Sequence, residues 1–192
     1  MKLFVSFRRL FDALKQSSKG SILIETAFIV PAIMVLATGG FEVTRFALCY
    51  QKVNRIAVSM ADLVSQAKEV NETDISGLFD AVEHIGAPFD VKTNADVIIT
   101  SVSPDAGTGV PTVNWQRSGG GSYSATSKIG VAGGTATLPS GFTLSPGDTV
   151  IIAEAFYNYS PEIFMDIVQP TVLYNVAYFR PRLGTLDVVK PG

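Results

Sequence analysis

The longest apolar run of the chain lies near its N-terminus, between Ser21 and Phe41. It has the sequence SILIETAFIVPAIMVLATGGF, in which Glu25 is the single charged residue. Twenty-one helical residues measure about 31 Å, which matches a hydrocarbon core of roughly 30 Å. A buried core helix of a soluble protein is the alternative, but apolar residues fill every face, so we predict a transmembrane helix over 21–41. Pro31 lacks an amide hydrogen and is expected to kink this helix.

The apolar pattern changes after the transmembrane segment. No Pro or Gly interrupts the chain from Phe41 to Val70, and apolar residues now recur every three or four positions with polar residues opposite. We therefore expect one helix from about Ser21 to Ala67, with an amphipathic extension in the segment 42–70. The side expected to pack in a core contains eight residues: Val43, Phe46, Tyr50, Val53, Ala57, Val58, Ala61 and Val64.

The rest of the chain predicts a small extracytoplasmic α+β domain over 71–192. A second helix is expected after Asn71 or Thr73, either of which suits an N-cap, and Gly86 and Pro88 are expected to end it. Segments rich in β-branched and aromatic residues then predict an antiparallel sheet of about four strands: 95–102, 110–116, 149–159 and 172–179.

Glycine is concentrated between the predicted second and third strands. The stretch from Ser103 to Gly147 holds ten of the seventeen glycines and is rich in Ser and Thr. We expect a long, loop-rich insertion with short strands, and its order and any binding role stay open. Its last residues, 145–148, have the sequence SPGD and predict a tight turn into the strand at Thr149.

Basic residues precede the apolar run. Residues 1–20 contain five Lys or Arg and one Asp. Because positive charge marks the cytoplasmic side, we expect a cytoplasmic N-terminus in a bacterial inner membrane, with the C-terminal domain in the periplasm. The Leu and Phe residues of this leader suit a helix on the anionic membrane surface, or they are incidental to a charged tail, and both interpretations remain open.

Side chains for catalysis, metal binding or nucleic-acid binding are scarce. His84 is the only histidine and Cys49 the only cysteine, so we expect no disulfide, zinc site or Cys-His dyad. The glycines 119–121 lack the Lys and Ser or Thr that a phosphate-binding loop requires. The net charge of −2 gives no reason to expect a nucleic-acid partner, and we predict neither an enzyme nor a cofactor. Three carboxylates show no pairing signal: Asp148, Glu154 and Asp166.

One spacing at the start of the apolar run is informative. Gly20 is followed by Ser21, three apolar residues and Glu25. An ionisable side chain in a membrane span costs a few kcal/mol and is a functional candidate, although a carboxylate that snorkels to the interface is an equal alternative. A basic leader that ends in Gly, before an apolar helix with Glu at its fifth position, resembles the prepilin signal of type IV filament subunits.

The stretch GSILIETAFIVP, from Gly20 to Pro31, resembles more closely the N-terminal signature of the TadE-like family, the minor pseudopilins of the tight-adherence (Flp) pilus. The stretches GDTVIIAEAFYNYSP and AYFRPRLG are also similar to the C-terminal parts of TadE- and TadG-like chains. The resemblance implies a pilin-like fold and cleavage between Gly20 and Ser21 by a prepilin peptidase. It further implies that Glu25 acts in assembly, by pairing with the free amine of a neighbouring subunit.

Two functions remain open at this point. A minor pseudopilin would lose the leader 1–20, act in pilus biogenesis and pack its helix against other pilin or pseudopilin subunits in membrane lipid. An uncleaved membrane-anchored periplasmic scaffold or binding module would retain the leader. The N-terminus of the mature protein separates the two functions.

Overall fold

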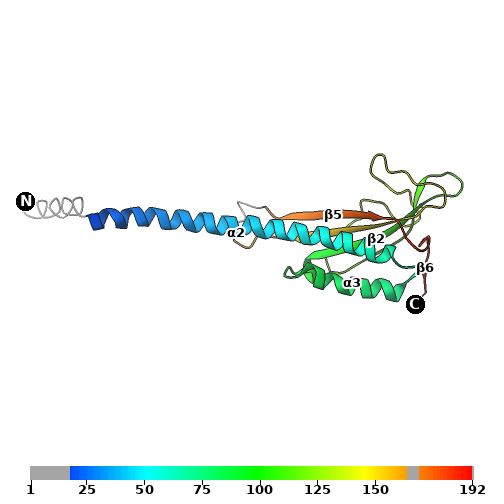
Figure 1. Cartoon of the computed structure of the whole chain (residues 1–192), viewed down its shortest axis with the longest axis horizontal. Coiled ribbons are helices and arrows are strands. Elements are labelled where there is room, and N and C mark those ends of the chain that lie inside the picture. Colours follow the sequence, from blue (N-terminus) through cyan, green and yellow to red (C-terminus); the bar gives the residue numbers. More distant parts are fainter. Residues whose placement is uncertain (1–17, 164–168, 192) are drawn as a thin grey trace, which may run out of the picture.

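A long helix and a four-stranded sheet organise the molecule. The structure is a computed structural model that describes residues 18–163 and 169–191, so nearly all of the predicted leader lies outside the described residues. Figure 1 shows the long helix projecting from a domain that packs beside its second half. The elements follow in chain order: α2 (Ser18–Ser65), β1 (Val70–Asn71), α3 (Glu72–Gly86), α4 (Val91–Asn94), β2 (Ala95–Pro104), β3 (Pro111–Gly119), β4 (Val150–Tyr159), β5 (Thr171–Phe179) and β6 (Val189–Lys190).

Helix α2 confirms the predicted continuous helix and runs without interruption through Pro31. It ends at Ser65, so the segment 42–70 is not helical to its end as expected. The reason is that Val70 belongs to β1, which pairs with β6 in the C-terminal tail. The kink expected at Pro31 remains a prediction.

The second half of α2 buries a face that differs in part from the predicted one. Cys49, Ile56 and Met60 lie in the core although the expected set omits them. The buried face is broader because α2 packs against α3 as well as against the sheet, and local periodicity does not reveal where α3 lies. Four members of the expected set are buried: Val53, Ala57, Ala61 and Val64. Three are exposed, contrary to expectation: Val43, Tyr50 and Val58.

Helix α3 follows its predicted course. Of the two N-cap candidates, Asn71 takes the role, since its Oδ1 accepts a hydrogen bond of 2.8 Å from the backbone N–H of Asp74. Ile75 and Val82 are buried against α2 and the sheet, so this side of α3 faces the core. Gly86 is the last residue of the helix, as expected, and a Cβ there would lie 2.0 Å from a methyl carbon of Val91.

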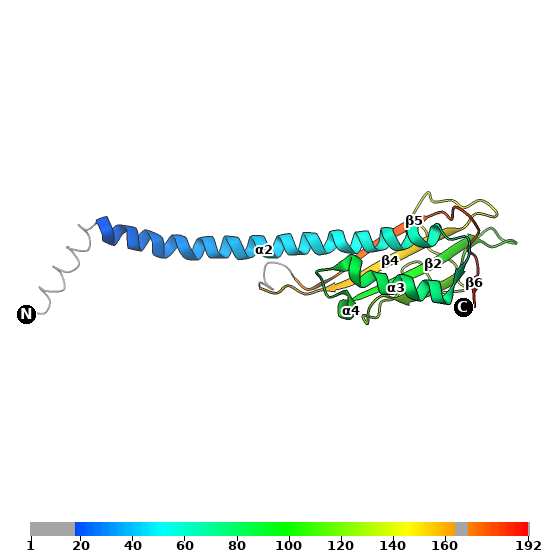
Figure 2. The same ribbon diagram turned by 60° about the horizontal axis from the view of Figure 1, so that its bottom comes forward.

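All four predicted strands form one antiparallel sheet in the order β3-β2-β4-β5. The central strands β2 and β4 are buried over most of their length. Helices α2 and α3 lie on one face of this sheet, as Figure 2 shows. The fold is thus α+β with a small antiparallel sheet, as expected.

The segment 120–149 covers the other face of the sheet. It contributes Ile129 and Ala136 to a second apolar cluster, which strand residues complete: Val102, Val113, Val150 and Ile152. The short strands expected here do not form in the described residues, where Thr112 and Thr135 make only an isolated bridge. The expected turn is present, with the N–H of Asp148 donating to the carbonyl of Ser145 at 2.9 Å.

The C-terminal tail closes the far end of the domain. The carbonyl of buried Leu186 accepts hydrogen bonds from Trp115 Nε1 at 2.8 Å and from Ser101 Oγ at 2.9 Å. The N–H of Arg182 donates to the carbonyl of Ser65 at 2.9 Å, where α2 ends. The tail therefore ties the sheet to the helix, which the sequence pattern did not predict.

Candidate functional site

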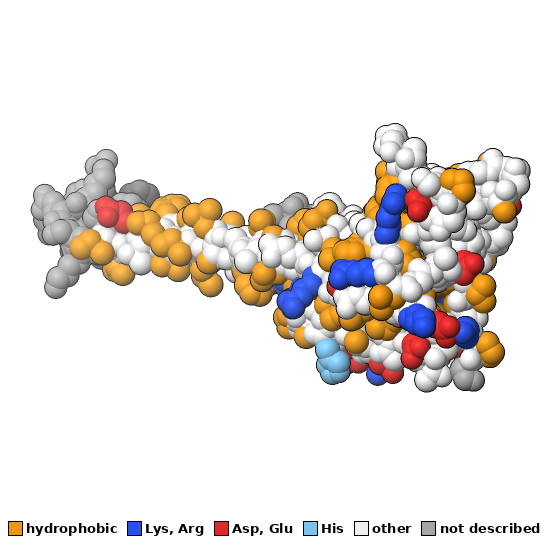
Figure 3. All heavy atoms as spheres, turned by 45° about the vertical axis from the view of Figure 1, so that its right-hand side comes forward, with side chains coloured by type: hydrophobic (Ala, Val, Ile, Leu, Met, Phe, Trp, Pro, Cys, Tyr) orange, Lys and Arg blue, Asp and Glu red, His pale blue; other side chains and the backbone are white. Residues whose placement is uncertain are grey.

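The first half of α2 forms an apolar stem, defined here as residues 22–41. Every side chain from 22 to 37 is exposed, and the most apolar 18-residue window has a mean hydropathy of 2.1 with none of it buried. Figure 3 shows apolar side chains along the stem, while charged side chains gather on the domain. By length and composition this helix can cross a membrane.

Hydroxyl groups on the stem bond to the helix that carries them. Thr26 Oγ1 donates to the carbonyl of Ile22 at 2.7 Å. Thr38 Oγ1 donates to the carbonyl of Met34, also at 2.7 Å. Because lipid offers no hydrogen-bond partners, polar groups that are satisfied inside the helix suit a lipid environment.

The predicted signal residues follow one another along this helix. Gly20 and Ser21 lie in its first turns, and Glu25 is exposed about one turn further on. Pro31 is exposed near the middle of the stem. Figure 1 shows this part of α2 projecting beyond the folded domain.

A buried carboxylate marks the point at which the stem enters the domain. Glu42 is fully buried, and the hydroxyl of Tyr159 donates to its Oε1 at 2.6 Å. The backbone N–H groups of Glu162 and Ile163 donate to its Oε2 at 3.3 Å and 3.2 Å. The Tyr159 hydrogen bond, with help from these N–H groups and Arg45, holds the pKa of Glu42 below its ordinary value against the opposing effect of burial.

Arg45 extends this cluster. Its Nη1 lies 3.9 Å from Glu42 Oε1, and its Nη2 lies 2.6 Å from Glu162 Oε1. Its guanidinium also lies 5.7 Å from the ring centroids of both Phe89 and Tyr159. Burial and the neighbouring Glu42 carboxylate raise the pKa of Tyr159 to about 12, so the phenol stays a hydrogen-bond donor at neutral pH.

Together Glu42, Arg45, Tyr159 and Glu162 form what we call the anchor cluster. It joins α2 to the end of β4, 117 residues later in the chain. A buried, paired charge fixes geometry, since displacing either partner leaves an uncompensated charge. The sequence interpretation missed this cluster; the only signal was a Glu and an Arg three residues apart at the start of the amphipathic half.

A second buried carboxylate, Glu154 on β4, holds the segment 120–149 on the sheet. Ser127 Oγ donates to its Oε2 in a short hydrogen bond. The N–H of Lys128 and the hydroxyl of Tyr174 donate to its Oε1 at 2.9 Å and 3.1 Å. The sequence shows no pairing signal for Glu154 because its donors come from two segments that are distant along the chain.

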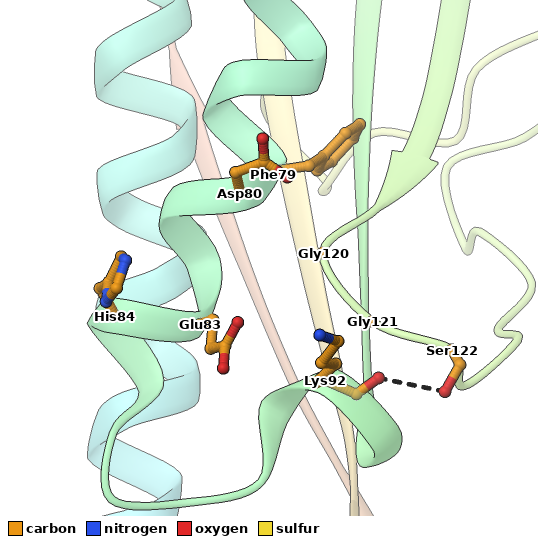
Figure 4. Close-up of a pocket in the computed structure, with 8 residues that line it drawn as sticks. All are labelled: Phe79, Asp80, Glu83, His84, Lys92, Gly120, Gly121 and Ser122. Atoms are coloured by element: carbon orange, nitrogen blue, oxygen red, sulfur yellow. Dashed lines mark hydrogen bonds between the residues drawn. The ribbon is translucent and has the colours of Figure 1, made fainter.

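A cleft of about 610 Å³ lies between α3, α4 and the segment after β3. Asp80, Glu83 and Lys92 contribute its charged side chains. Figure 4 shows the His84 side chain on the other side of α3 from Gly120 and Gly121. Among the described residues no group of three or more His, Cys, Asp or Glu could hold a metal ion.

The glycines at this cleft have a packing role. A Cβ at Gly119 would lie 2.6 Å from the ring of Phe79, and one at Gly121 would lie 2.2 Å from the carbonyl oxygen of Ala95. The chain can pass this close to α3 and β2 only without side chains. Close packing is therefore sufficient to explain why glycine occupies these positions, and no bound ligand is needed for the explanation.

Comparisons with protein-family models, curated proteins and solved structures find no match for this chain.

Proposed function

We propose that this chain is a minor pseudopilin that acts in the biogenesis of a tight-adherence pilus. The observation that carries the proposal is a single helix whose first half is an exposed apolar stem and whose second half is the spine of a small α+β domain. Such a chain can be held in a bilayer and can later pack its stem against helices of other subunits, because the folded domain does not use the stem for its core.

Glu25 is the proposed assembly residue. A carboxylate near the start of an otherwise apolar stem is costly in lipid, and a cationic partner removes most of that cost. Cleavage between Gly20 and Ser21 by a prepilin peptidase would create an amine on Ser21 and would make Glu25 the fifth residue of the mature chain. That amine on one subunit and Glu25 on its neighbour would then pair.

The proposed orientation places the N-terminus in the cytoplasm and the domain in the periplasm. The basic leader supports it, since positive charge stays on the cytoplasmic side. The anchor cluster begins directly after the stem, so it would hold the domain close to the periplasmic membrane surface.

Mass spectrometry of the mature N-terminus tests the proposal. In cells with an active prepilin peptidase we expect the protein to begin at Ser21, a loss of roughly a tenth of its 20.5 kDa mass. Cells without the peptidase should retain Met1. A protein that begins at Met1 in both strains would refute the pseudopilin and leave the uncleaved scaffold.

The assembly role of Glu25 has a separate test. We expect Glu25→Gln to be cleaved normally but to lower piliation by tenfold or more, about what loss of a 1.4 kcal/mol charge pairing produces. Glu25→Asp keeps the charge and should retain most piliation. Thr26→Val, at the neighbouring position, is the control for changes to the stem alone. Normal piliation with Glu25→Gln would remove Glu25 from the proposal.

A further inference from the structure

The continuity of α2 fixes how high the domain sits above a bilayer. The helix runs without a break from Ser18 to Ser65, so the stem and the helix in the domain core are one element. The stem, residues 22–41, measures about 30 Å, which is the thickness of a hydrocarbon core. When the stem spans a bilayer, Phe41 therefore lies at the edge of the hydrocarbon core. The headgroup layer adds roughly 5–7 Å, which corresponds to about the next four residues of α2.

A second segment of the chain lies at the level of this headgroup layer. Strand β4 ends at Tyr159, whose hydroxyl bonds to Glu42, the first residue of α2 beyond the stem. The chain after β4 stays at that level, because the N–H groups of Glu162 and Ile163 donate to Glu42 Oε2 at 3.3 Å and 3.2 Å. Figure 2 shows the end of β4 and the beginning of β5 on the stem side of the domain, beside α2. Ile163 is thus held next to the point at which the stem leaves the hydrocarbon core.

Large apolar side chains are exposed at this level. Ile163 is 47% exposed, although its backbone is held by the buried Glu42. Phe41 and Val43, which precede and follow Glu42 on α2, are 53% and 52% exposed. Apolar side chains next to a membrane-spanning helix gain free energy when they enter the boundary between headgroups and acyl chains.

The charged groups at this level do not favour anionic lipid. Arg45 is directed to carboxylates of the protein itself, with Nη2 2.6 Å from Glu162 Oε1 and Nη1 3.9 Å from Glu42 Oε1. One guanidinium and two carboxylates leave a net negative charge in the anchor cluster. On the neighbouring loop and α4, the exposed Asp90 and Lys92 balance each other. A contact with lipid at this level is therefore apolar and not electrostatic.

We propose that Ile163 enters the interfacial layer of the bilayer beside the stem and gives the domain a second contact with lipid. Together with Phe41 and Val43 it forms one apolar surface at the base of the domain. Because Ile163 lies on one side of α2, the contact also favours a tilt of the stem toward that side. The proposal rests on the membrane insertion of the stem that the proposed function includes, but not on leader cleavage or on a role in a pilus.

The arrangement around α2 favours lipid over the stem of a second copy as the partner of this surface. Phe41 and Val43 lie on opposite sides of Glu42, each about 100° around the helix from it. One helix of a second copy contacts one side of α2 and cannot cover both residues together with Ile163. The interfacial layer of a bilayer surrounds the helix and reaches all three, even around a single inserted chain.

Quenching by spin-labelled lipid tests the proposal on the full-length chain. Ile163→Cys in a Cys49→Ala background is labelled with the fluorophore NBD and placed, one chain per disc, in phosphatidylcholine nanodiscs whose lipid has a nitroxide near the headgroup end of the acyl chain. We expect its emission to fall at least about twofold relative to discs without nitroxide. Val30→Cys, within the stem, is the reference for a label inside the bilayer. Leu183→Cys, at a 66% exposed apolar position, is the matched control. It follows Arg182, which bonds to Ser65, about 36 Å beyond Phe41 along α2, so its emission should stay unchanged.

The three labels separate failure of this inference from failure of the proposed function. Quenching of the Val30→Cys label, with the Ile163→Cys label no more quenched than Leu183→Cys, overturns the lipid contact and leaves the transmembrane stem intact. No quenching of the Val30→Cys label shows that the stem lies outside the bilayer and overturns both. Quenching of the Ile163→Cys label only in discs that hold two chains assigns the surface to a second copy. A change of more than about twofold when phosphatidylglycerol is added, or when the salt concentration is raised, overturns an apolar contact. Unchanged Trp115 emission confirms that each labelled protein is folded.

Discussion

Removal of one hydroxyl group, by Tyr159→Phe, tests whether the anchor cluster joins the helix to the sheet. The ring of Tyr159 keeps its packing, including the edge-to-face contact with Phe46 at 5.2 Å between centroids. Only the 2.6 Å hydrogen bond to Glu42 is lost. The substitution therefore isolates one donor to a buried carboxylate.

The expected loss of stability follows from that geometry. A hydrogen bond to a charged group contributes about 1.5–3 kcal/mol, so we expect the free energy of unfolding to fall by about 2 kcal/mol. Two longer backbone hydrogen bonds and Arg45 remain on Glu42, which keeps the loss below the roughly 3–5 kcal/mol expected when a buried ion pair is broken. In a chain of 192 residues, 2 kcal/mol lowers the Tm by roughly 4–8 °C.

Thermal and urea unfolding of the full chain in detergent provide the assay, with the emission of Trp115 as the signal. Trp115 is the only tryptophan and is buried, with its Nε1 bonded to Leu186 in the C-terminal tail. It therefore reports on the folded domain and not on the stem. Tyr50→Phe, at a half-exposed tyrosine on α2, is the matched control and should change the Tm by less than about 1 °C.

The effect should also depend on pH with a definite sign. The folded-state pKa of Glu42 lies below the ordinary 4.5, so the ionised carboxylate stabilises the fold fully above about pH 4.5. This stability is lost as the pH falls through the folded-state value. The difference between the wild type and Tyr159→Phe should thus be full near about pH 7 and shrink below about pH 4. Equal stability of the two proteins near neutral pH, or a difference that does not change with pH, would refute this account.

Two further predictions concern packing and burial in the domain. Gly121→Ala should destabilise the fold by about 2 kcal/mol or more in the same unfolding assay, because its Cβ would lie 2.2 Å from the carbonyl oxygen of Ala95. Gly77→Ala, in α3 with nothing within 4 Å of its Cβ, should instead stabilise it by about 0.5–1 kcal/mol, and destabilisation there would contradict the described packing. Burial raises the pKa of the Cys49 thiol to about 12, so iodoacetamide should label the folded chain at mildly alkaline pH far more slowly than the urea-unfolded chain. Comparable labelling rates, measured by mass spectrometry, would show that Cys49 is accessible.

The local pattern of apolar and polar residues was sufficient to predict the helices and strands, whose structure depends on neighbours in sequence. Helix α2, helix α3 and all four strands of the sheet lie close to their predicted bounds, because apolar periodicity reflects which faces are covered. The apolar stem was equally predictable from sequence, since its exposed side chains have no partner elsewhere in the described domain to be identified. The residues Gly20, Ser21 and Glu25 were selected because their spacing resembles a prepilin signal, and Pro31 as a proline inside the predicted helix; their roles are proposals.

Local sequence patterns could not predict the contacts between segments that are distant along the chain. The burial of Glu42 depends on Tyr159 and on the chain after β4, which no local pattern indicates. Glu154 obtains its donors from the insertion and from β5. The buried face of α2 was only partly predicted because the position of α3 beside it is a tertiary property.

The sequence by itself therefore determined the elements of this protein: an apolar stem, an amphipathic helix, a short helix and four strands. Only the tertiary structure decided the order β3-β2-β4-β5 and the burial of two carboxylates. The physical reason is that the spacing of apolar residues shows which side of a helix or strand is buried, but not which residues bury it. Hydrogen-bond partners and strand neighbours are instead selected by the whole fold, which brings together residues more than a hundred positions apart.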